Sequence, residues 1–151
     1  MKEIYLIGSL RNPDIPTFAN EVRKMNYKVF DDWFSPGPEA DDFWRKYETE
    51  RGRTYEEALQ GYAGQHVYEF DKHHIDRCDI GLLMMPAGKS GHIELGYMIG
   101  KGKPCFILMD NPDRWDVMYQ FLNENGGGIF FDKGKLLAHL WELQHEADKN
   151  V

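Results

Sequence analysis

A chain of 151 residues has room for one domain with a buried core, and its 42% hydrophobic and 28% charged residues are the proportions of an ordinary globular protein. A formal net charge of −7 argues against a broad surface for a nucleic-acid polymer or an anionic membrane, because both require a cationic face. Without an apolar run of membrane-spanning length, and with a charged start unlike a signal peptide, the sequence favours a cytoplasmic protein.

The predicted elements alternate between strand and helix. Short apolar runs have the length of buried strands, and the longer segments between them show helical spacing of their apolar residues. In chain order these are strand 4–8, helix 16–25, strand 27–30, helices 40–51 and 54–77 (the latter interrupted near 61–64), strand 80–85, helix 91–100, strand 104–109, helix 114–122, strand 128–131 and helix 136–146. This order predicts an α/β fold in a single domain over residues 1–151: a doubly wound, Rossmann-like or flavodoxin-like sheet of five mainly parallel strands, flanked by helices.

The loops that follow the carboxyl ends of the predicted strands are the candidate ligand-binding segments, because open parallel sheets bind ligands at that edge. They are residues 9–13, 31–39, 86–90 and 110–113. The second loop is rich in aromatic residues and contains Trp33. Stacking on a flat ligand and a hydrophobic contact with another subunit explain these aromatics about equally well.

The loop 86–90 joins a buried strand to a helix and consists mostly of small residues. The backbone N–H groups and the dipole at such a helix start form an anion site. Gly88, Ser90 and Gly91 are therefore candidate ligand-binding residues.

Glu94 lies one turn into the same helix, with glycines on either side. These small neighbours leave room for a ligand or for another backbone, and the helix N-terminus favours the ionised carboxylate, which suits a nucleophile. The alternative is a solvated glutamate that stabilises the helix start, and spacing alone favours that alternative.

Asp71 is the second carboxylate of interest, because it interrupts the apolar stripe of a predicted helix. A carboxylate on a buried stripe is costly unless it is paired or functional. Pairing with Lys72, His74 or Arg11 is the structural alternative to a place in a site.

The first strand carries Tyr5 and ends in a loop that contains Gly8, Ser9 and Arg11. Arg11 suits a bidentate contact with a phosphate, and Ser9 suits a hydrogen bond to one. The alternatives are a surface arginine beside a turn and an ordinary core tyrosine.

The histidines and cysteines do not form a metal motif. H-E-x-x-H is absent, and the adjacent His73 and His74 point to different faces of a helix. Cys78 and Cys105 lie in apolar runs and are predicted to be buried free thiols. The sequence predicts neither a metal nor a cofactor.

Three motifs together resemble the nucleoside 2-deoxyribosyltransferase superfamily, which includes 2′-deoxynucleoside 5′-phosphate N-hydrolases and CMP-type N-hydrolases. They are YLIGSLR from Tyr5, D-x3-I-x2-C-D from Asp71 and GHIELG around Glu94, and the resemblance extends to about residue 110. It implies that Glu94 attacks the anomeric carbon and forms a glycosyl–enzyme ester, that Asp71 handles protons at the departing base, and that Tyr5 orients the glutamate. It also implies a small-molecule nucleoside or nucleotide as substrate and a homodimer or higher homo-oligomer.

The resemblance also bears on the substrate. The segment Gly-Ser-Leu-Arg at 8–11 is similar to the phosphate-binding Gly-Ser-Ile-Arg of the deoxynucleotide hydrolases, whereas the transferases lack this arginine. Transferases commonly carry an aspartate six residues before the nucleophile, where this chain has Gly88. Both differences favour a 5′-phosphate over a free 5′-hydroxyl, and Trp33 falls where contacts with the base are expected.

The leading hypothesis is an enzyme that cleaves the N-glycosidic bond of a (deoxy)nucleoside 5′-monophosphate and releases base and sugar phosphate. The first alternative is a nucleoside 2-deoxyribosyltransferase that moves the sugar between bases through the same Glu94. The second is a non-catalytic nucleotide-binding or sensor domain, which would tolerate loss of Glu94. Cleavage of NAD is less favoured, because the phosphate loop is short.

Overall fold

The computed structural model describes residues 1–149, with side chains described up to residue 146, and its centre is a five-stranded parallel sheet. The strands are β1 (Glu3–Ile7), β2 (Lys28–Phe30), β3 (Ile80–Met84), β4 (Cys105–Leu108) and β5 (Gly128–Phe130). Their order is β2-β1-β3-β4-β5, the flavodoxin-like one, in which the direction of winding reverses between β1 and β3. The predicted doubly wound α/β fold is confirmed, and the last two residues of the predicted domain lie outside the described part.

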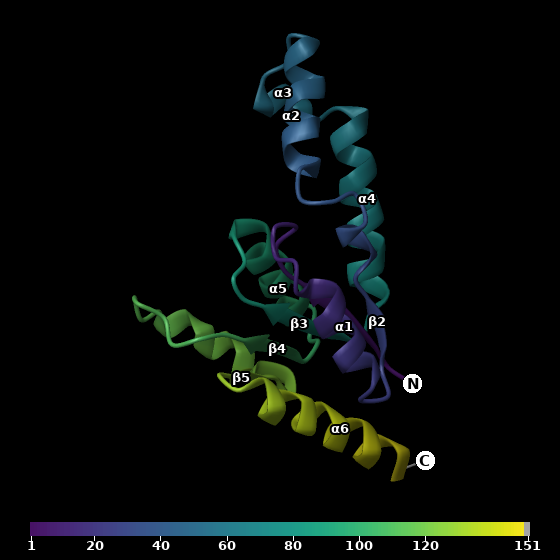
Figure 1. Cartoon of the computed structure of the whole chain (residues 1–151), viewed down its shortest axis with the longest axis vertical. Helices are drawn as coiled ribbons and strands as arrows, with labels where there is room; N and C mark the ends of the chain where they lie inside the picture. The colour runs from purple at the N-terminus through teal and green to yellow at the C-terminus, as the bar shows by residue number, and fades with distance from the viewer. Residues whose placement is uncertain (150–151) are drawn as a thin grey trace.

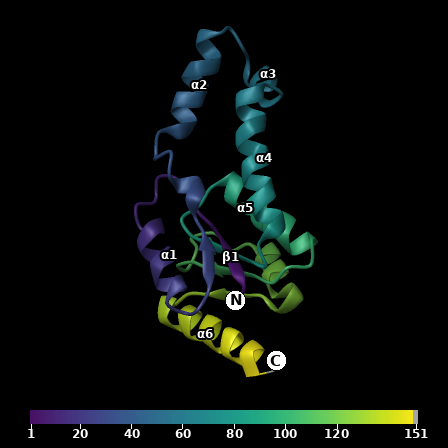
Figure 2. The same cartoon turned by 90° about the vertical axis from the view of Figure 1, so that its right-hand side faces the viewer.

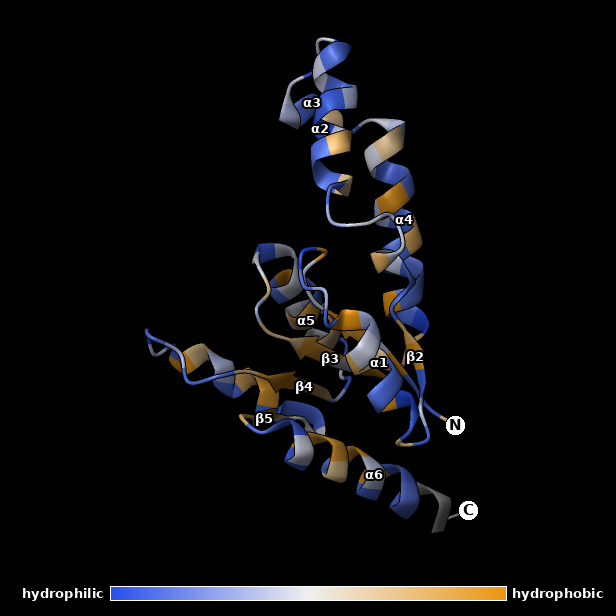
Figure 3. Ribbon diagram, viewed as in Figure 1, coloured by the Kyte–Doolittle hydropathy of each residue, from blue (hydrophilic) through white to orange (hydrophobic). Residues whose placement is uncertain are grey.

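Each strand divides its side chains between two apolar layers, because successive residues point to opposite faces of the sheet. Ile4 and Leu6 pack with α1 and α6 on one face, whereas Tyr5 and Ile7 pack with α4, α5 and the 3-10 helix η2 on the other (Figure 1). The strands themselves are largely apolar, as buried parallel strands require (Figure 3). The covering helices are α1 (Ile15–Arg23), α4 (Tyr62–Arg77), α5 (Lys89–Gly100), η2 (Val117–Gly126) and α6 (Lys133–Lys149).

Between β2 and β3 the chain forms a helical arm that extends beyond the sheet (Figure 1, Figure 2). The short 3-10 helix η1 (Asp32–Phe34) leads into it, and the arm consists of α2 (Ala40–Glu50), α3 (Tyr55–Leu59) and the first half of α4. Gly64 lets α4 approach α2, since a Cβ at that position would lie 3.2 Å from the ring of Trp44.

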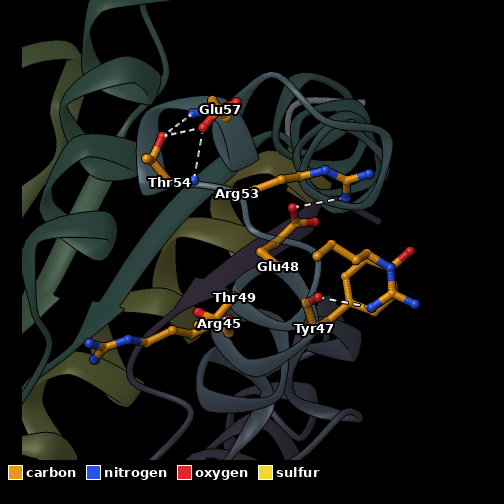
Figure 4. Close-up of polar contacts among 8 residues, drawn as sticks. Arg45, Tyr47, Glu48, Thr49, Arg53, Thr54 and Glu57 are labelled. Atoms are coloured by element: carbon orange, nitrogen blue, oxygen red, sulfur yellow. Dashed lines mark hydrogen bonds and ion pairs between the residues drawn. The ribbon is translucent and has the colours of Figure 1, made fainter.

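Polar contacts fix the tip of the arm (Figure 4). The buried carboxylate of Glu48 accepts a hydrogen bond from the Arg53 guanidinium at 3.1 Å. The Thr54 hydroxyl accepts from the N–H of Glu57 at 3.2 Å, and the Glu57 carboxylate accepts from the N–H of Thr54 at 3.1 Å. This capping box begins α3, and Gly61, in an extended conformation, then begins α4. The interruption predicted within helix 54–77 is confirmed.

One predicted helix is wrong in its bounds and its type. The segment expected as an α-helix over 114–122 is the 3-10 helix η2, which begins only at Val117. The Asp116 carboxylate accepts a hydrogen bond from the N–H of Met118 at 2.8 Å and so sets this later start. The other predicted elements are present with ends shifted by a few residues. No helix within residues 1–149 has both the length and the apolar character that a membrane span needs.

Candidate active site

The candidate site lies on the face of the sheet covered by α4 and α5. Tyr5 projects from β1 into this layer and is 1% exposed. Asp71 comes from α4 and Glu94 from α5. The strand order reverses between β1 and β3, so these elements meet where a doubly wound sheet binds its ligand.

Glu94 is placed by the close packing of α5 on the sheet. Gly91 is buried, and a Cβ there would meet Ile7 Cγ2 at 3.2 Å and Leu83 Cδ1 at 3.3 Å. A glycine therefore lets the start of α5 lie close to β1 and β3 without displacing these side chains, and this packing brings Glu94 over the sheet. The space beside this glycine is filled by side chains of β1 and β3, so at Gly91 the structure contains neither of the two predicted alternatives, a ligand or another backbone.

The pKa of Glu94 is raised from its ordinary value of 4.5 to about 7, first by burial and second by the charge of Asp71. The sequence predicted the opposite, an ionised form favoured by the helix N-terminus. That prediction was wrong, because the loss of hydration and the neighbouring carboxylate outweigh the helix dipole.

Asp71 reaches the same region because α4 runs antiparallel to β3, whose amino end it precedes. Seven residues separate Asp71 from Cys78 at the end of α4, which is about 10 Å along a helix. A strand the length of β3 spans about 16 Å. Because α4 runs in the opposite direction to β3, residues that lie earlier in α4, such as Asp71, lie nearer to the carboxyl end of the sheet. Burial raises the pKa of Asp71 to about 6.

None of the three predicted structural partners binds Asp71. Lys72 Nζ pairs with Asp76 at 2.7 Å, and Arg11 pairs with Asp42 at 3.6 Å. His74 Nδ1 accepts a hydrogen bond from Arg77 Nε at 2.7 Å. The half-buried carboxyl of Asp71 is thus not explained by any of these pairings.

Tyr5, Asp71 and Glu94 lie close enough together for the charges of both carboxylates to act on Tyr5 and for that of Asp71 to act on Glu94. Burial raises the pKa of Tyr5 far above its ordinary range, and the charges of Glu94 and then Asp71 raise it further. Asp71 acts on Glu94 in the same way. The structure therefore brings together the three side chains to which the family resemblance assigns catalytic roles.

The loop after β1 is shaped by its own hydrogen bonds. Ser9 Oγ accepts from the N–H of Arg11 at 3.1 Å. A Cβ at Gly8 would lie 2.5 Å from Ile15 Cδ1, so the glycine allows α1 to pack against the loop. The Arg11 guanidinium is exposed and pairs only loosely with Asp42 of the arm. An exposed pair of this kind is worth about 0–1 kcal/mol and does not hold Arg11 away from a phosphate.

The loop before α5 contains the other predicted anion ligands. Gly88 and Ser90 are exposed, and Gly88 is the residue that precedes the first helical residue. His92 ties this loop to η2, because its Nδ1 lies 2.8 Å from the carbonyl oxygen of Gly88 and its Nε2 lies 2.9 Å from the Tyr119 hydroxyl. No local sequence pattern indicates this link, because Tyr119 follows His92 by 27 residues.

Trp33 lies on η1 and packs against β1. Its indole N–H donates to the carbonyl oxygen of Leu6 at 2.6 Å, and its ring packs edge-on against Phe34. Because β1 occupies the polar edge of the indole, the part of Trp33 that can contact a ligand is the face of its ring.

Two apolar cavities lie elsewhere on the molecule, of about 570 Å³ beyond the ends of β4 and β5 and about 390 Å³ between α5 and η2. Neither is lined by Tyr5, Asp71 or Glu94. Across the described side chains, no three histidine, cysteine, aspartate or glutamate residues gather in a way that could hold a metal ion. Cys78 and Cys105 are buried free thiols, as predicted.

The fold is that of known nucleoside-processing enzymes. The CMP N-glycosidase BcmB of Clostridium botulinum superposes with a TM-score of 0.57 at 14% identity, over 92% of this chain and 98% of that one. A 2-deoxyribosyltransferase of Bacillus psychrosaccharolyticus superposes with a TM-score of 0.58 at 17% identity, over 91% and 95% of the two chains. No family model matches the sequence, and no curated protein matches it either.

Proposed function

We propose that this chain is an N-glycosidase of the nucleoside 2-deoxyribosyltransferase superfamily that cleaves a (deoxy)nucleoside 5′-monophosphate into base and sugar phosphate. The observation that carries the proposal is the electrostatic coupling of Tyr5, Asp71 and Glu94 on one face of the sheet. The likeness in fold to a CMP N-glycosidase and a 2-deoxyribosyltransferase supports the same class of reaction.

Glu94 is the proposed nucleophile and Asp71 the proposed acid and base. The Glu94 carboxylate attacks the anomeric carbon while the N-glycosidic bond breaks, and the bonding electrons pass to the base nitrogen as the base takes the proton of Asp71. Asp71 then accepts a proton from water, whose oxygen attacks the same carbon and releases Glu94. Tyr5 is the proposed positioning residue for the glutamate, as the family resemblance implies.

The proposed division of labour needs one proton on the pair of carboxyls, and it needs that proton on Asp71. With pKa values of about 6 for Asp71 and about 7 for Glu94, the pair carries about one proton between these two pH values, and Glu94 holds most of it before substrate binds. The reaction needs one carboxylate to attack and one carboxylic acid to protonate the base. A bound substrate has to leave that proton on Asp71, and the positive charge that develops at the sugar favours an ionised Glu94 beside it.

The proposed phosphate site combines the loop after β1 with the start of α5. Arg11 would contact two phosphate oxygens, and Ser9, Ser90 and the backbone N–H groups near Gly88 would donate further hydrogen bonds. The exposure of Arg11 and its loose pairing with Asp42 support this role, because a phosphate can displace the aspartate at little cost.

The test is base release from nucleoside 5′-monophosphates and nucleosides, followed by chromatography. We expect the wild-type chain to release base from nucleotides and Glu94→Gln to lose essentially all turnover with its fold intact by circular dichroism. Ligand-dependent thermal stabilisation without any base release would instead support a nucleotide-binding or sensor domain.

A 2-deoxyribosyltransferase is the second candidate, because one of the structural neighbours is such an enzyme. The same Glu94 intermediate would then pass its sugar to a second base. Adding a free base to the assay separates the two functions, since a new nucleoside or nucleotide in the mixture would contradict pure hydrolysis.

A further inference from the structure

Four aromatic rings form a continuous stack from β1 to α4, here called the aromatic stack. Tyr5 stacks on Phe30 with centroids 5.4 Å apart, and Phe30 stacks on His74 at 4.0 Å. Phe70 packs edge-on against His74 at 4.7 Å and lies 6.0 Å from Phe30. The hydrogen bond from Arg77 fixes the His74 ring, so the stack has a rigid base.

Phe70 differs from the other members because much of its ring is open to solvent. It is 45% exposed, whereas Phe30 is 5% and Tyr5 1% exposed. Its ring is nonetheless held in place by two neighbours, and it directly precedes Asp71 in α4. An aromatic ring with one side packed and the other open, beside a candidate proton donor, is suited to stack on a planar ligand.

We propose that Phe70 is the stacking wall for the departing base. The inference rests on the proposed function, in which Asp71 gives its proton to the base and the base plane must therefore come within hydrogen-bond reach of that carboxyl. Phe70 packs against Phe30, which stacks on Tyr5, so its partly open ring lies on the same layer of the sheet as the candidate site. The ligand class is any planar nucleobase, because every base has a flat face that can stack on an aromatic ring.

Other exposed aromatic residues fit this role less well. Tyr55 and Tyr62 are 72% and 95% exposed on the arm and have no ring contact with the aromatic stack. Trp115 lines the cavity beyond β4 and β5, which contains none of the three candidate catalytic side chains. Phe70, in contrast, contacts Phe30, the ring on which Tyr5 stacks.

The test is equilibrium binding in the inactive Glu94→Gln background, by calorimetry, with two ligands that differ by the base. A 2′-deoxynucleoside 5′-monophosphate carries a base, and ribose 5-phosphate does not. Adding Phe70→Leu should raise Kd for the nucleotide about tenfold, the effect of one lost stacking contact, and leave Kd for ribose 5-phosphate unchanged. Phe70→Trp should restore nucleotide binding to within about twofold of Phe70, because it restores the aromatic face.

The matched control is Phe43→Leu, which removes an exposed ring of the arm and should change neither Kd. Equal weakening of both ligands by Phe70→Leu would overturn the proposal in favour of a purely structural role. An unchanged nucleotide Kd together with a lower mass in light scattering would assign Phe70 to a subunit contact instead. Failure of the proposed function looks different, because wild-type protein would then release no base from any nucleotide.

Discussion

At the scale of single residues, the most informative group is Glu94, because burial in the folded protein disfavours its ionised form. Its pKa of about 7 in the folded protein lies above the ordinary 4.5, so the folded chain binds this proton more tightly than the unfolded chain does. The free energy of unfolding therefore falls as the pH rises from about 4.5 to about 7, and the full penalty is present above pH 7.

Glu94→Gln should remove that penalty. At pH 8 we expect the variant to be more stable than the wild type by roughly 1–3 kcal/mol, and at pH 4 we expect the two to be nearly equal. Thermal unfolding followed by circular dichroism at the two pH values measures the difference. A variant that is less stable by the same amount at both values would contradict the burial of an ionisable Glu94.

Arg11 permits a second prediction at this scale. Arg11→Ala should raise KM for nucleoside monophosphates roughly tenfold to a hundredfold, the effect of a lost charge-assisted contact, and change KM for nucleosides little. The control is Arg45→Ala, which removes an exposed arginine from α2 of the arm and should alter neither KM value. Equal changes for nucleotides and nucleosides with Arg11→Ala would remove the case for a phosphate site.

At the scale of elements, α5 shows how one glycine positions a helix. A Cβ at Gly91 would press on Ile7 and Leu83, whereas a Cβ at Gly96 in the same helix would meet nothing within 4 Å. We expect Gly91→Ala to lower the free energy of unfolding by about 1–3 kcal/mol and to reduce kcat, because it lifts Glu94 from the sheet.

Gly96→Ala is the matched change in α5. It should be neutral or stabilise by up to about 1 kcal/mol, since alanine is the better helix former. Chemical denaturation of both variants, with base release measured in parallel, gives the comparison. Similar stabilities for the two variants would mean that α5 is not seated on the sheet as described.

The element order was predictable, but several contacts between elements were not. The alternation of apolar strands and helices fixed the sheet, and the position of Glu94 one turn into its helix followed from the glycine pattern around it. The approach of Asp71 to Glu94 depends on how far α4 runs back along β3, and the aromatic stack depends on the rotation of α4 over β2. Neither quantity leaves a local pattern in the sequence, which is also why the raised pKa of Glu94 was missed.

At the scale of the whole molecule, the helical arm is the feature that a minimal doubly wound domain does not need. Its surface carries apolar side chains that are mostly open to solvent, and monomeric proteins seldom gather many such side chains in one place. They include Phe43, Tyr47, Tyr55, Leu59, Tyr62, Val67 and Tyr68.

We expect the chain to form at least a homodimer, as the family resemblance implies. Light scattering coupled to size-exclusion chromatography should give a mass of at least twice the 17.7 kDa of the single chain. A mass of one chain at concentrations well above those of the activity assay would contradict this expectation.

The arm lies in the connection between β2 and β3, and this position has a consequence for synthesis on the ribosome. Ile4 of β1 pairs with Ile80 of β3, 76 residues later, because the arm is translated between them. At ordinary translation rates this interval lasts about 4 to 15 s, during which β2 can pair with one edge of β1 while its other edge stays open. An open apolar edge is a template for pairing with another nascent chain. The protein therefore passes through a period of vulnerability to aggregation, and the residues of the arm lengthen this period.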